Sequence, residues 1–240
     1  MKADKPFVSA VIVGAGSGTR MGGVNKALIR IGDKSAFRMV LDAFGDSALT
    51  DEIVIVCRDA QALRSECVGF DKKPLTFAEG GRTRGESVLN GTRTARKESA
   101  FYCIHDCARP LVTSKIIDAV ISAALESGAA TACSPVTDTV KYVDRETGTV
   151  YTPDRRHLLA VQTPQVFAAN VYKISAALAK KDGITATDDT ALAEHAGFSV
   201  EYVETDRGNI KLTSAEDVLI ARLFEARRQK EGTNENRSRI

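Results

Sequence analysis

Short β-branched runs alternate along the chain with segments of helical periodicity, and this alternation limits the possible folds more than any other feature of the sequence. The runs at 7–13 and 52–57 are almost continuously apolar, as strands buried on both faces tend to be. Further runs of this kind lie at 75–78, 101–105 and 130–136. Between the runs, apolar residues recur with the period of a helix within 37–44 and 116–124. The pattern predicts an α/β fold in which helices cover both faces of a mostly parallel sheet.

A glycine-rich segment, GAGSGTRMGGVNKAL at 14–28, follows the first run directly. Its glycines carry no side chain and adopt positive φ freely, so backbone N–H groups can approach an anion closely. Arg20 and Lys26 bring positive charge to the same place. Ligands on sheets of this kind bind beyond the carboxyl ends of the strands. The segment therefore indicates a cradle for a triphosphate, and a tight strand-to-helix turn with two solvated cations is the structural alternative.

Two familiar phosphate-binding motifs do not fit this segment. A dinucleotide fingerprint needs glycine at the position of Thr19 and a helix that opens at once. A P-loop needs Gly-Lys-Ser/Thr, whereas Val24 and Asn25 follow Gly23. The spacing thus excludes a dehydrogenase of the usual kind and points to a phosphate cradle of another type.

A second cluster, CIHDCARP at 103–110, lies at the end of the fourth run. Asp106 falls at the same sheet edge as the glycine segment, and Mg²⁺ usually takes only one or two protein carboxylates, so Asp106 is a candidate ligand for a magnesium ion that bridges phosphates. The structural alternatives are a capping role for Asp106 and an ion pair between Arg109 and a nearby carboxylate.

Cys103, His105 and Cys107 alternate within this cluster and could face one side of a strand, as zinc ligands would. No fourth ligand stands at a recognisable spacing. The ligand count therefore favours two packed thiols beside a core histidine.

The composition excludes several classes of protein. With 240 residues, 43% apolar residues and a formal net charge of +2, the chain shows no sign of a basic patch for nucleic acid. No apolar segment approaches the roughly 20 residues needed to cross a membrane, and the start, MKADKPF, contains no signal-peptide core. The five cysteines include no C-x-x-C pair, which argues against a disulfide framework. We expect a cytoplasmic protein with neither nucleic acid nor membrane as a partner.

Seven ordered motifs between residues 8 and 223 carry a resemblance to a known family. They are GAGSGTRMGGVNKAL (14–28), GGRTRGESVLNG (80–91), HDCARP (105–110), PVTDTVK (135–141), QTPQVF (162–167), TDDTALAE (187–194) and GNIKLT (208–213). With them the sequence resembles the 2-C-methyl-D-erythritol 4-phosphate cytidylyltransferases of the non-mevalonate isoprenoid pathway, within the nucleotide-diphospho-sugar transferase superfamily. The resemblance implies a Rossmann-like sheet. It also implies an enzyme that transfers CMP from CTP to methylerythritol phosphate, giving 4-diphosphocytidyl-2-C-methyl-D-erythritol and pyrophosphate.

The resemblance further implies roles for single residues. The catalytic residues, which contact phosphates and stabilise charge at the α-phosphorus, would be Arg20, Lys26 and Lys211. The residues that would bind the nucleotide are Gly14, Ala15, Gly16, Ser17, Gly18, Gly80, Gly81, Arg84, Ser87 and Asp106, with Asp106 holding Mg²⁺ or another divalent cation. The residues that would hold the polyol phosphate or orient its attack are Thr139, Arg155, Thr187 and Lys211.

The sequence departs from the family's pattern at three positions. Gly14 and Cys107 stand where alanine is common, and Asn25 stands where proline usually precedes the lysine. All three are small or loop positions, so the departures concern fine geometry rather than the reaction.

The implied chemistry needs no general base. A phosphate monoester has a second pKa of about 6, so its oxygen is already an anionic nucleophile at neutral pH. Catalysis then consists of holding two polyanions in line and neutralising charge on the α-phosphoryl group. Lysine, arginine, magnesium and backbone N–H groups are suited to that work.

The segment at about 137–162 is a long excursion for an α/β domain. Val140, Tyr142 and Val150 flank a turn-like stretch and predict a protruding β-hairpin arm. In the resembled family this segment is a dimer arm. We therefore expect a homodimer in which Arg155 and Thr139 reach the partner's active site; an ordinary solvent-exposed hairpin is the alternative.

The domain organisation expected from the sequence is simple. Residues 1–230 form a single nucleotidyltransferase domain that includes the arm. A last helix ends near Arg228, and the polar residues 231–240 form a flexible tail.

Two functional alternatives stay open on the sequence alone. The same transfer to another polyol phosphate, such as ribitol 5-phosphate, would preserve most of the motifs, because specificity depends on a few hydrogen bonds that spacing does not reveal. A nucleotide-binding regulatory module without turnover would keep the glycine segment. Such a module has no reason to retain Lys26, Asp106 and Lys211 together.

Overall fold

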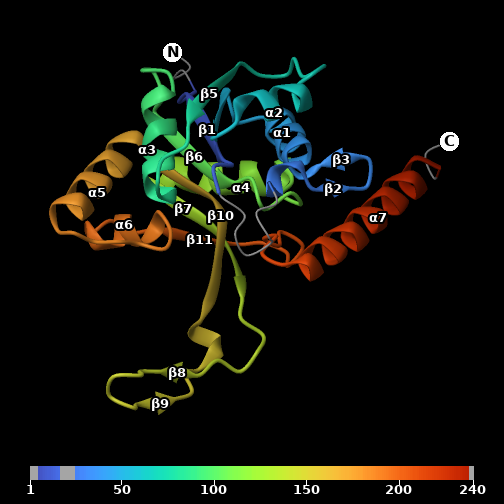
Figure 1. The fold of residues 1–240 in the computed structure, drawn as a ribbon. Helices are drawn as coiled ribbons and strands as arrows, with labels where there is room; N and C mark the ends of the chain where they lie inside the picture. Colours follow the sequence, from blue (N-terminus) through green and yellow to red (C-terminus); the bar gives the residue numbers. More distant parts are fainter. Residues whose placement is uncertain (1–4, 17–24, 238–240) are drawn as a thin grey trace.

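The computed structural model describes residues 5–16 and 25–237, with side chains described as far as residue 230 (Figure 1). Three residues assigned to the nucleotide site, Ser17, Gly18 and Arg20, lie outside the described residues. The last three positions of the expected tail, 238–240, lie outside them as well.

A seven-stranded sheet in the order β11-β7-β10-β6-β1-β4-β5 forms the centre of the fold. Its strands are β1 (Val8–Val13), β4 (Glu52–Cys57), β5 (Leu75–Glu79), β6 (Phe101–Asp106), β7 (Ala129–Pro135), β10 (Leu159–Ala168) and β11 (Glu201–Glu204). All pairings are parallel except those of β10, which runs antiparallel to β6 and β7. The five runs expected as strands are all strands of this sheet, and the mostly parallel architecture is confirmed.

Helices cover both faces of the sheet because alternate residues of its buried strands point to opposite sides. On one face, residues such as Ile12 and Ile55 pack against α1 (Ala36–Asp46), α2 (Ala60–Glu66) and α4 (Ser114–Ser127). On the other, Val11 and Val54 pack towards α3 (Arg84–Thr94), α5 (Ala169–Lys181) and α6 (Thr190–His195). None of the described helices is long and apolar enough to span a membrane.

Strand β10 was not expected from the sequence, because its middle reads Gln-Thr-Pro-Gln rather than as an apolar run. The polar side chains are nevertheless buried and bonded: Gln162 Oε1 accepts from Asn209 Nδ2 at 2.8 Å, and Asp106 N donates to Thr163 Oγ1 at 3.1 Å. The ladder with β7 is irregular around Pro164, which has no N–H to donate. Hydrogen bonds to residues far along the chain thus stabilise a strand that its local sequence does not predict.

The predicted hairpin is present and projects from the body of the molecule (Figure 1). Its strands are β8 (Tyr142–Val143) and β9 (Val150–Tyr151), which pair antiparallel. The rings of Tyr142 and Tyr151 lie across the ladder with centroids 4.8 Å apart. Both rings are about half exposed, so the arm carries apolar surface that this chain leaves uncovered.

The C-terminal helix corrects one expectation. Helix α7 (Ala215–Arg237) continues past Arg228, so most of the segment expected to be a polar tail is helical. Glu225 Oε1 accepts from Gln229 Nε2 at 3.0 Å, an i,i+4 pair of the kind that extends helices, and no proline interrupts the segment. The helix packs through Val218 and Ala221 on the small hairpin of β2 (Arg30–Ile31) and β3 (Lys34–Ser35).

Gly91 gives a test of the packing between α3 and the sheet. A Cβ added there would overlap Val11 Cγ1 and lie 2.7 Å from Val56 Cγ2, two rigid side chains in the sheet. We expect Gly91→Ala to lower the free energy of unfolding by about 1–3 kcal/mol, measured by urea denaturation. Gly85→Ala, in the same helix but with no atom within 4 Å of the new Cβ, should not destabilise. Equal effects of the two substitutions would contradict this packing.

Candidate active site

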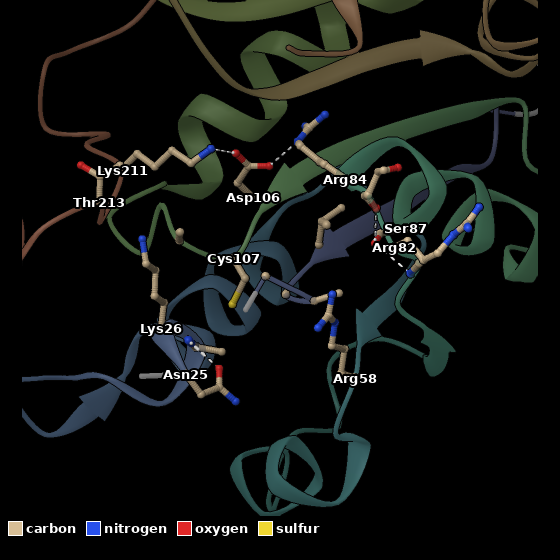
Figure 2. A pocket seen from close by; sticks show the side chains of 18 residues that line it. Asn25, Lys26, Arg58, Arg82, Arg84, Ser87, Asp106, Cys107, Lys211 and Thr213 are labelled. Carbon is tan, nitrogen blue, oxygen red and sulfur yellow. Dashed lines mark hydrogen bonds and ion pairs between the residues drawn. The ribbon is translucent and has the colours of Figure 1, made fainter. Parts of the chain in front are cut away.

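A cavity of about 460 Å³ opens at the carboxyl ends of β1, β4, β5 and β6 (Figure 2). The structure brings together there most of the residues assigned from the sequence: Gly14, Ala15, Gly16, Lys26, Gly81, Arg84, Ser87, Asp106 and Lys211. Arg58, Arg82 and Thr83 line it as well and were not expected. Arg58 follows β4 directly, so its place at the strand ends is the signal that could have indicated it.

The start of the glycine segment is fixed by backbone pairing. Gly14 N donates to Val56 O at 2.8 Å, and Cys107 N donates to Val13 O at 3.0 Å, so β4 and β6 hold the chain on either side. A Cβ at Gly14 would meet Cys107 Cβ at 3.5 Å, an ordinary contact. Gly14 and Cys107, two of the departures from the family's pattern, therefore fit the site without strain.

Lys26 begins a short helical turn, η2 (Lys26–Leu28), that Asn25 caps. Asn25 Oδ1 accepts from Ala27 N at 3.1 Å, which explains how asparagine serves where the family usually has proline. Lys26 Nζ donates to Leu212 O at 2.8 Å. This bond thus joins the end of the glycine segment to the residue that follows Lys211.

The turn after β5 needs its two glycines for steric reasons. A Cβ at Gly80 would overlap Ala15 Cβ, and one at Gly81 would overlap Glu86 Cβ. Gly81 N donates to Ser87 Oγ at 3.0 Å, which orders the turn into α3. Gly81 lines the cavity, whereas Gly80 lies behind it as a buttress for the glycine segment.

Asp106 lies between two cations (Figure 2). Its Oδ1 accepts from Arg84 Nε at 3.0 Å and its Oδ2 from Lys211 Nζ at 2.5 Å. Burial alone would raise the pKa of Asp106, but the charges of Arg84 and Lys211 outweigh that effect and hold the pKa well below its usual range. The carboxylate is therefore ionised at any physiological pH.

Arg84 has a second carboxylate partner that sequence reasoning missed. Its Nη1 donates to Asp189 Oδ2 at 2.6 Å. The two carboxylates raise the pKa of Arg84 against the effect of burial, whereas burial raises the pKa of Asp189 and the guanidinium opposes that rise. Arg84 and Asp189 are 105 positions apart, and no spacing in the sequence signals the pair.

His105 and the two thiols at the end of the fourth predicted run, Cys103 and Cys107, are packed in the core, as the ligand count indicated. His105 Nδ1 lies 3.0 Å from Thr163 Oγ1 and its Nε2 lies 3.2 Å from Arg109 O. Burial lowers the pKa of His105 to about 4 and raises that of Cys107 to about 12. Among the described residues, no group of three or more His, Cys, Asp or Glu side chains could hold a metal ion.

Arg109 does not form the ion pair with a nearby carboxylate that was its structural alternative. Its Nη1 donates to the carbonyl of Asn209 at 2.8 Å, and among the described residues no carboxylate pairs with it. Burial lowers the pKa of Arg109 from its high ordinary value.

Three residues assigned to the polyol phosphate do not line the cavity. Thr139 and Arg155 belong to the arm, where Arg155 Nη1 donates to Thr137 O at 2.7 Å. Thr187 is exposed ahead of α6. The cavity is therefore lined by the described residues assigned to the nucleotide other than Gly80, and of those assigned to the polyol phosphate only by Lys211.

The donor set of the cavity fits a single divalent cation shared with phosphates. Asp106 is the one carboxylate among the described residues that line it, and Mg²⁺ fills most of its octahedron with water and phosphate oxygens. Both oxygens of Asp106 accept from cationic side chains, so a metal ion has to replace or share one of these partners.

Comparisons with known proteins agree with this geometry. The family model for 2-C-methyl-D-erythritol 4-phosphate cytidylyltransferase matches residues 8–226. A relative of that name from Caldanaerobacter subterraneus subsp. tengcongensis is 40% identical over 222 residues, which cover 90% of this chain and 98% of the relative. One from Symbiobacterium thermophilum is 37% identical over 90% of this chain and 92% of its own.

Solved structures show the same likeness. The 4-diphosphocytidyl-2C-methyl-D-erythritol synthase from Anaerococcus prevotii superposes with a TM-score of 0.84 at 27% identity, covering 93% of this chain and 97% of that one. The 2-C-methyl-D-erythritol 4-phosphate cytidylyltransferase from Thermus thermophilus gives 0.72 at 28% identity, covering 91% and 98%. With its cavity at the carboxyl edge of the sheet and a family match over most of its length, this chain belongs to the 2-C-methyl-D-erythritol 4-phosphate cytidylyltransferase family.

Proposed function

We propose that this protein transfers CMP from CTP to 2-C-methyl-D-erythritol 4-phosphate and releases pyrophosphate, a step in isoprenoid precursor synthesis. One observation carries the proposal: residues 14–16 and 25–27 of the glycine segment line one cavity together with Asp106 and Lys211, in a chain of the family named for this reaction. A regulatory module without turnover would not need that convergence.

The reaction is an in-line displacement at phosphorus. An oxygen of the acceptor's phosphate attacks the α-phosphorus of CTP and forms a new P–O bond. The bond from the α-phosphorus to the oxygen that bridges to the β-phosphorus breaks, and pyrophosphate leaves with the electron pair. Because the monoester is largely a dianion at neutral pH, no side chain has to remove a proton. His105, buried and bonded at both ring nitrogens, is not needed as a base.

The cations of the cavity provide the stabilisation that this displacement requires. Charge builds on the equatorial oxygens of the α-phosphoryl group and on the departing pyrophosphate. Lys26 and Lys211 line the cavity, and the bond from Lys26 to Leu212 O keeps both lysines at the same wall. Preorganised charges of this kind stabilise the transition state without reorganising during the reaction. We assign Arg20 to the triphosphate as well, from its place in the glycine segment.

We assign Asp106 as the ligand of Mg²⁺, which when bound neutralises phosphate charge and orients the triphosphate. The assignment is supported by the position of Asp106 at the cavity wall and by its ionised state. With the ion bound, Lys211 would be available to the acceptor's phosphate, for which its positive charge is suited.

The arm supports a homodimer. Val150 is 60% exposed and Tyr142 is 48% exposed on a two-stranded ribbon, which is marginally stable in water when it stands alone. A second copy that covers the arm would bury these side chains and could receive Arg155 and Thr139 at its own cavity. We also assign the protein to the cytoplasm, in keeping with five cysteines that are all free.

The first test is release of pyrophosphate from CTP with Mg²⁺ under three conditions. We expect release with methylerythritol phosphate, and only background release with ribitol 5-phosphate or without an acceptor. Equal or faster release with ribitol 5-phosphate would keep the mechanism and overturn the assigned acceptor. Failure to release pyrophosphate with methylerythritol phosphate would refute the proposed function.

Lys26→Ala tests the role of the lysine. Loss of one preorganised charge at the transition state should lower kcat by about 100-fold or more while the circular dichroism spectrum stays unchanged. The control is Lys97→Ala, at an exposed position that does not line the cavity, which should retain normal turnover. Normal turnover by the Lys26 variant would remove the lysine from the mechanism.

Subunit mixing tests whether Arg155 acts across the dimer. Lys26→Ala and Arg155→Ala should each be nearly inactive alone. Refolded together in equal amounts, they should recover about a quarter of normal turnover, because half of the dimers are mixed and each mixed dimer has one site with both residues intact. Mixtures that stay as inactive as two inactive parents would mean that Arg155 acts within its own chain, and a fully active Arg155→Ala variant would mean that Arg155 has no role in turnover.

A further inference from the structure

Four charged side chains form a continuous chain at the wall of the cavity. Asp189 accepts from Arg84 at 2.6 Å, Arg84 also donates to Asp106 at 3.0 Å, and Asp106 accepts from Lys211 at 2.5 Å. Two positive and two negative groups balance, so these four side chains together carry no net charge. The side chain of Asp189 is 1% exposed and that of Arg84 is 27% exposed, whereas Lys211 reaches solvent at 41%. The row of four side chains thus runs from the protein interior to the cavity.

Asp189 is held rigidly at the inner end of this chain. Its backbone N–H donates to Gln165 Oε1 at 3.0 Å, at the start of α6. Gln165 comes from β10, the strand that also carries the buried Thr163 beside Asp106. Asp189 does not line the cavity, and Arg84 is the cavity-lining residue with which it forms an ion pair.

The second carboxylate partner of Arg84 becomes important when a cation binds Asp106. In the proposed function a divalent cation binds Asp106 and draws on its negative charge, so the attraction of Asp106 for Arg84 becomes weaker. Removing the only partner of a largely buried charge is strongly unfavourable. Arg84 avoids this because Asp189 remains bonded to it at 2.6 Å.

We propose that Asp189 is a positioning residue that keeps Arg84 neutralised and thereby frees Asp106 to bind the divalent cation. The inference rests on the proposed function in one respect, the assignment of Asp106 as metal ligand. The simpler reading, that Asp189 only joins α6 to α3, predicts an effect on stability and none on the affinity for the cation.

The test substitutes Asp189→Asn, which keeps the size of the side chain and removes its negative charge. Among the described residues Arg84 then has Asp106 as its one carboxylate partner, and it competes more strongly with the cation. Calorimetry gives the affinity for CTP with Mn²⁺ and with EDTA, in the absence of any acceptor phosphate. The ratio of the two affinities measures what the cation contributes. We expect this ratio to fall by about tenfold in the variant, as is usual when a group behind a metal ligand is removed.

Two further variants control the experiment. Asp188→Asn removes a carboxylate one position away that accepts from Gln165 Nε2 and Thr190 Oγ1 and does not contact Arg84, so its ratio should match that of the wild type. In Arg84→Gln/Asp189→Asn the competing cation is gone together with its partner. This neutral pair should give a ratio no lower than that of the wild type, and it supplies the test if Asp189→Asn alone does not fold.

The outcomes separate the inference from the proposed function. The Mg²⁺ concentration for half-maximal turnover should rise in Asp189→Asn with a smaller change in kcat at saturating Mg²⁺. An unchanged ratio in a folded Asp189→Asn variant, or a double variant as weak as that single variant, would overturn the inference. So would a wild-type protein whose CTP affinity is the same with and without Mn²⁺. Turnover with methylerythritol phosphate is measured independently and decides the proposed function alone.

Discussion

The parallel pairing of β1 with β4 on one side and β6 on the other is the constraint on which the rest of the structure depends. Val13, the last residue of β1, pairs with Val56 and with Asp106, so the three strands end at the same level. A slip of one residue would exchange the two apolar faces of each strand, and the helices on both sides exclude it. Because the register is fixed in this way, whatever follows these strands in the sequence is delivered to one edge, where the cavity lies.

The pairing of charges explains how this edge of the sheet can be positively charged before a polyanion binds. The charged side chains that line the cavity among the described residues are Lys26, Arg58, Arg82, Arg84, Lys211 and a single acid, Asp106. Such an excess of positive charge would be costly if all of it were buried and unpaired. Much of it is paired within the protein, as in the contacts of Arg82 with Glu86, of Arg84 with Asp189 and of Lys211 with Asp106, and Arg58 is exposed to solvent. The ligand-free site is therefore stable while its potential stays positive.

Local features of the sequence were sufficient for five of the seven strands of the sheet, the arm and most of the cavity, because β-branched runs and glycine spacing act over a few residues. They failed where stability comes from long-range polar contacts. Strand β10 has an unfavourable local sequence and depends on bonds from Gln162 and Thr163 to groups far along the chain. Asp189 could not be assigned, since its partner Arg84 is 105 positions away. Position 109 shows the same limit: a carboxylate partner was the plausible alternative, and the fold supplied a backbone carbonyl.

The hydrogen bond from Lys26 Nζ to Leu212 O joins residues 186 positions apart, and it has a consequence for the order of assembly. Contacts of such long sequence separation form late, because a large loop must close before they contribute. A nascent chain still lacking residues 208–213 could shape its glycine turn on β1 and β4, yet it would have neither Lys211 nor the carbonyl that anchors Lys26. Catalytic competence is thus withheld during synthesis until nearly the whole polypeptide has left the ribosome, and a prematurely ended chain would be inert rather than partly active.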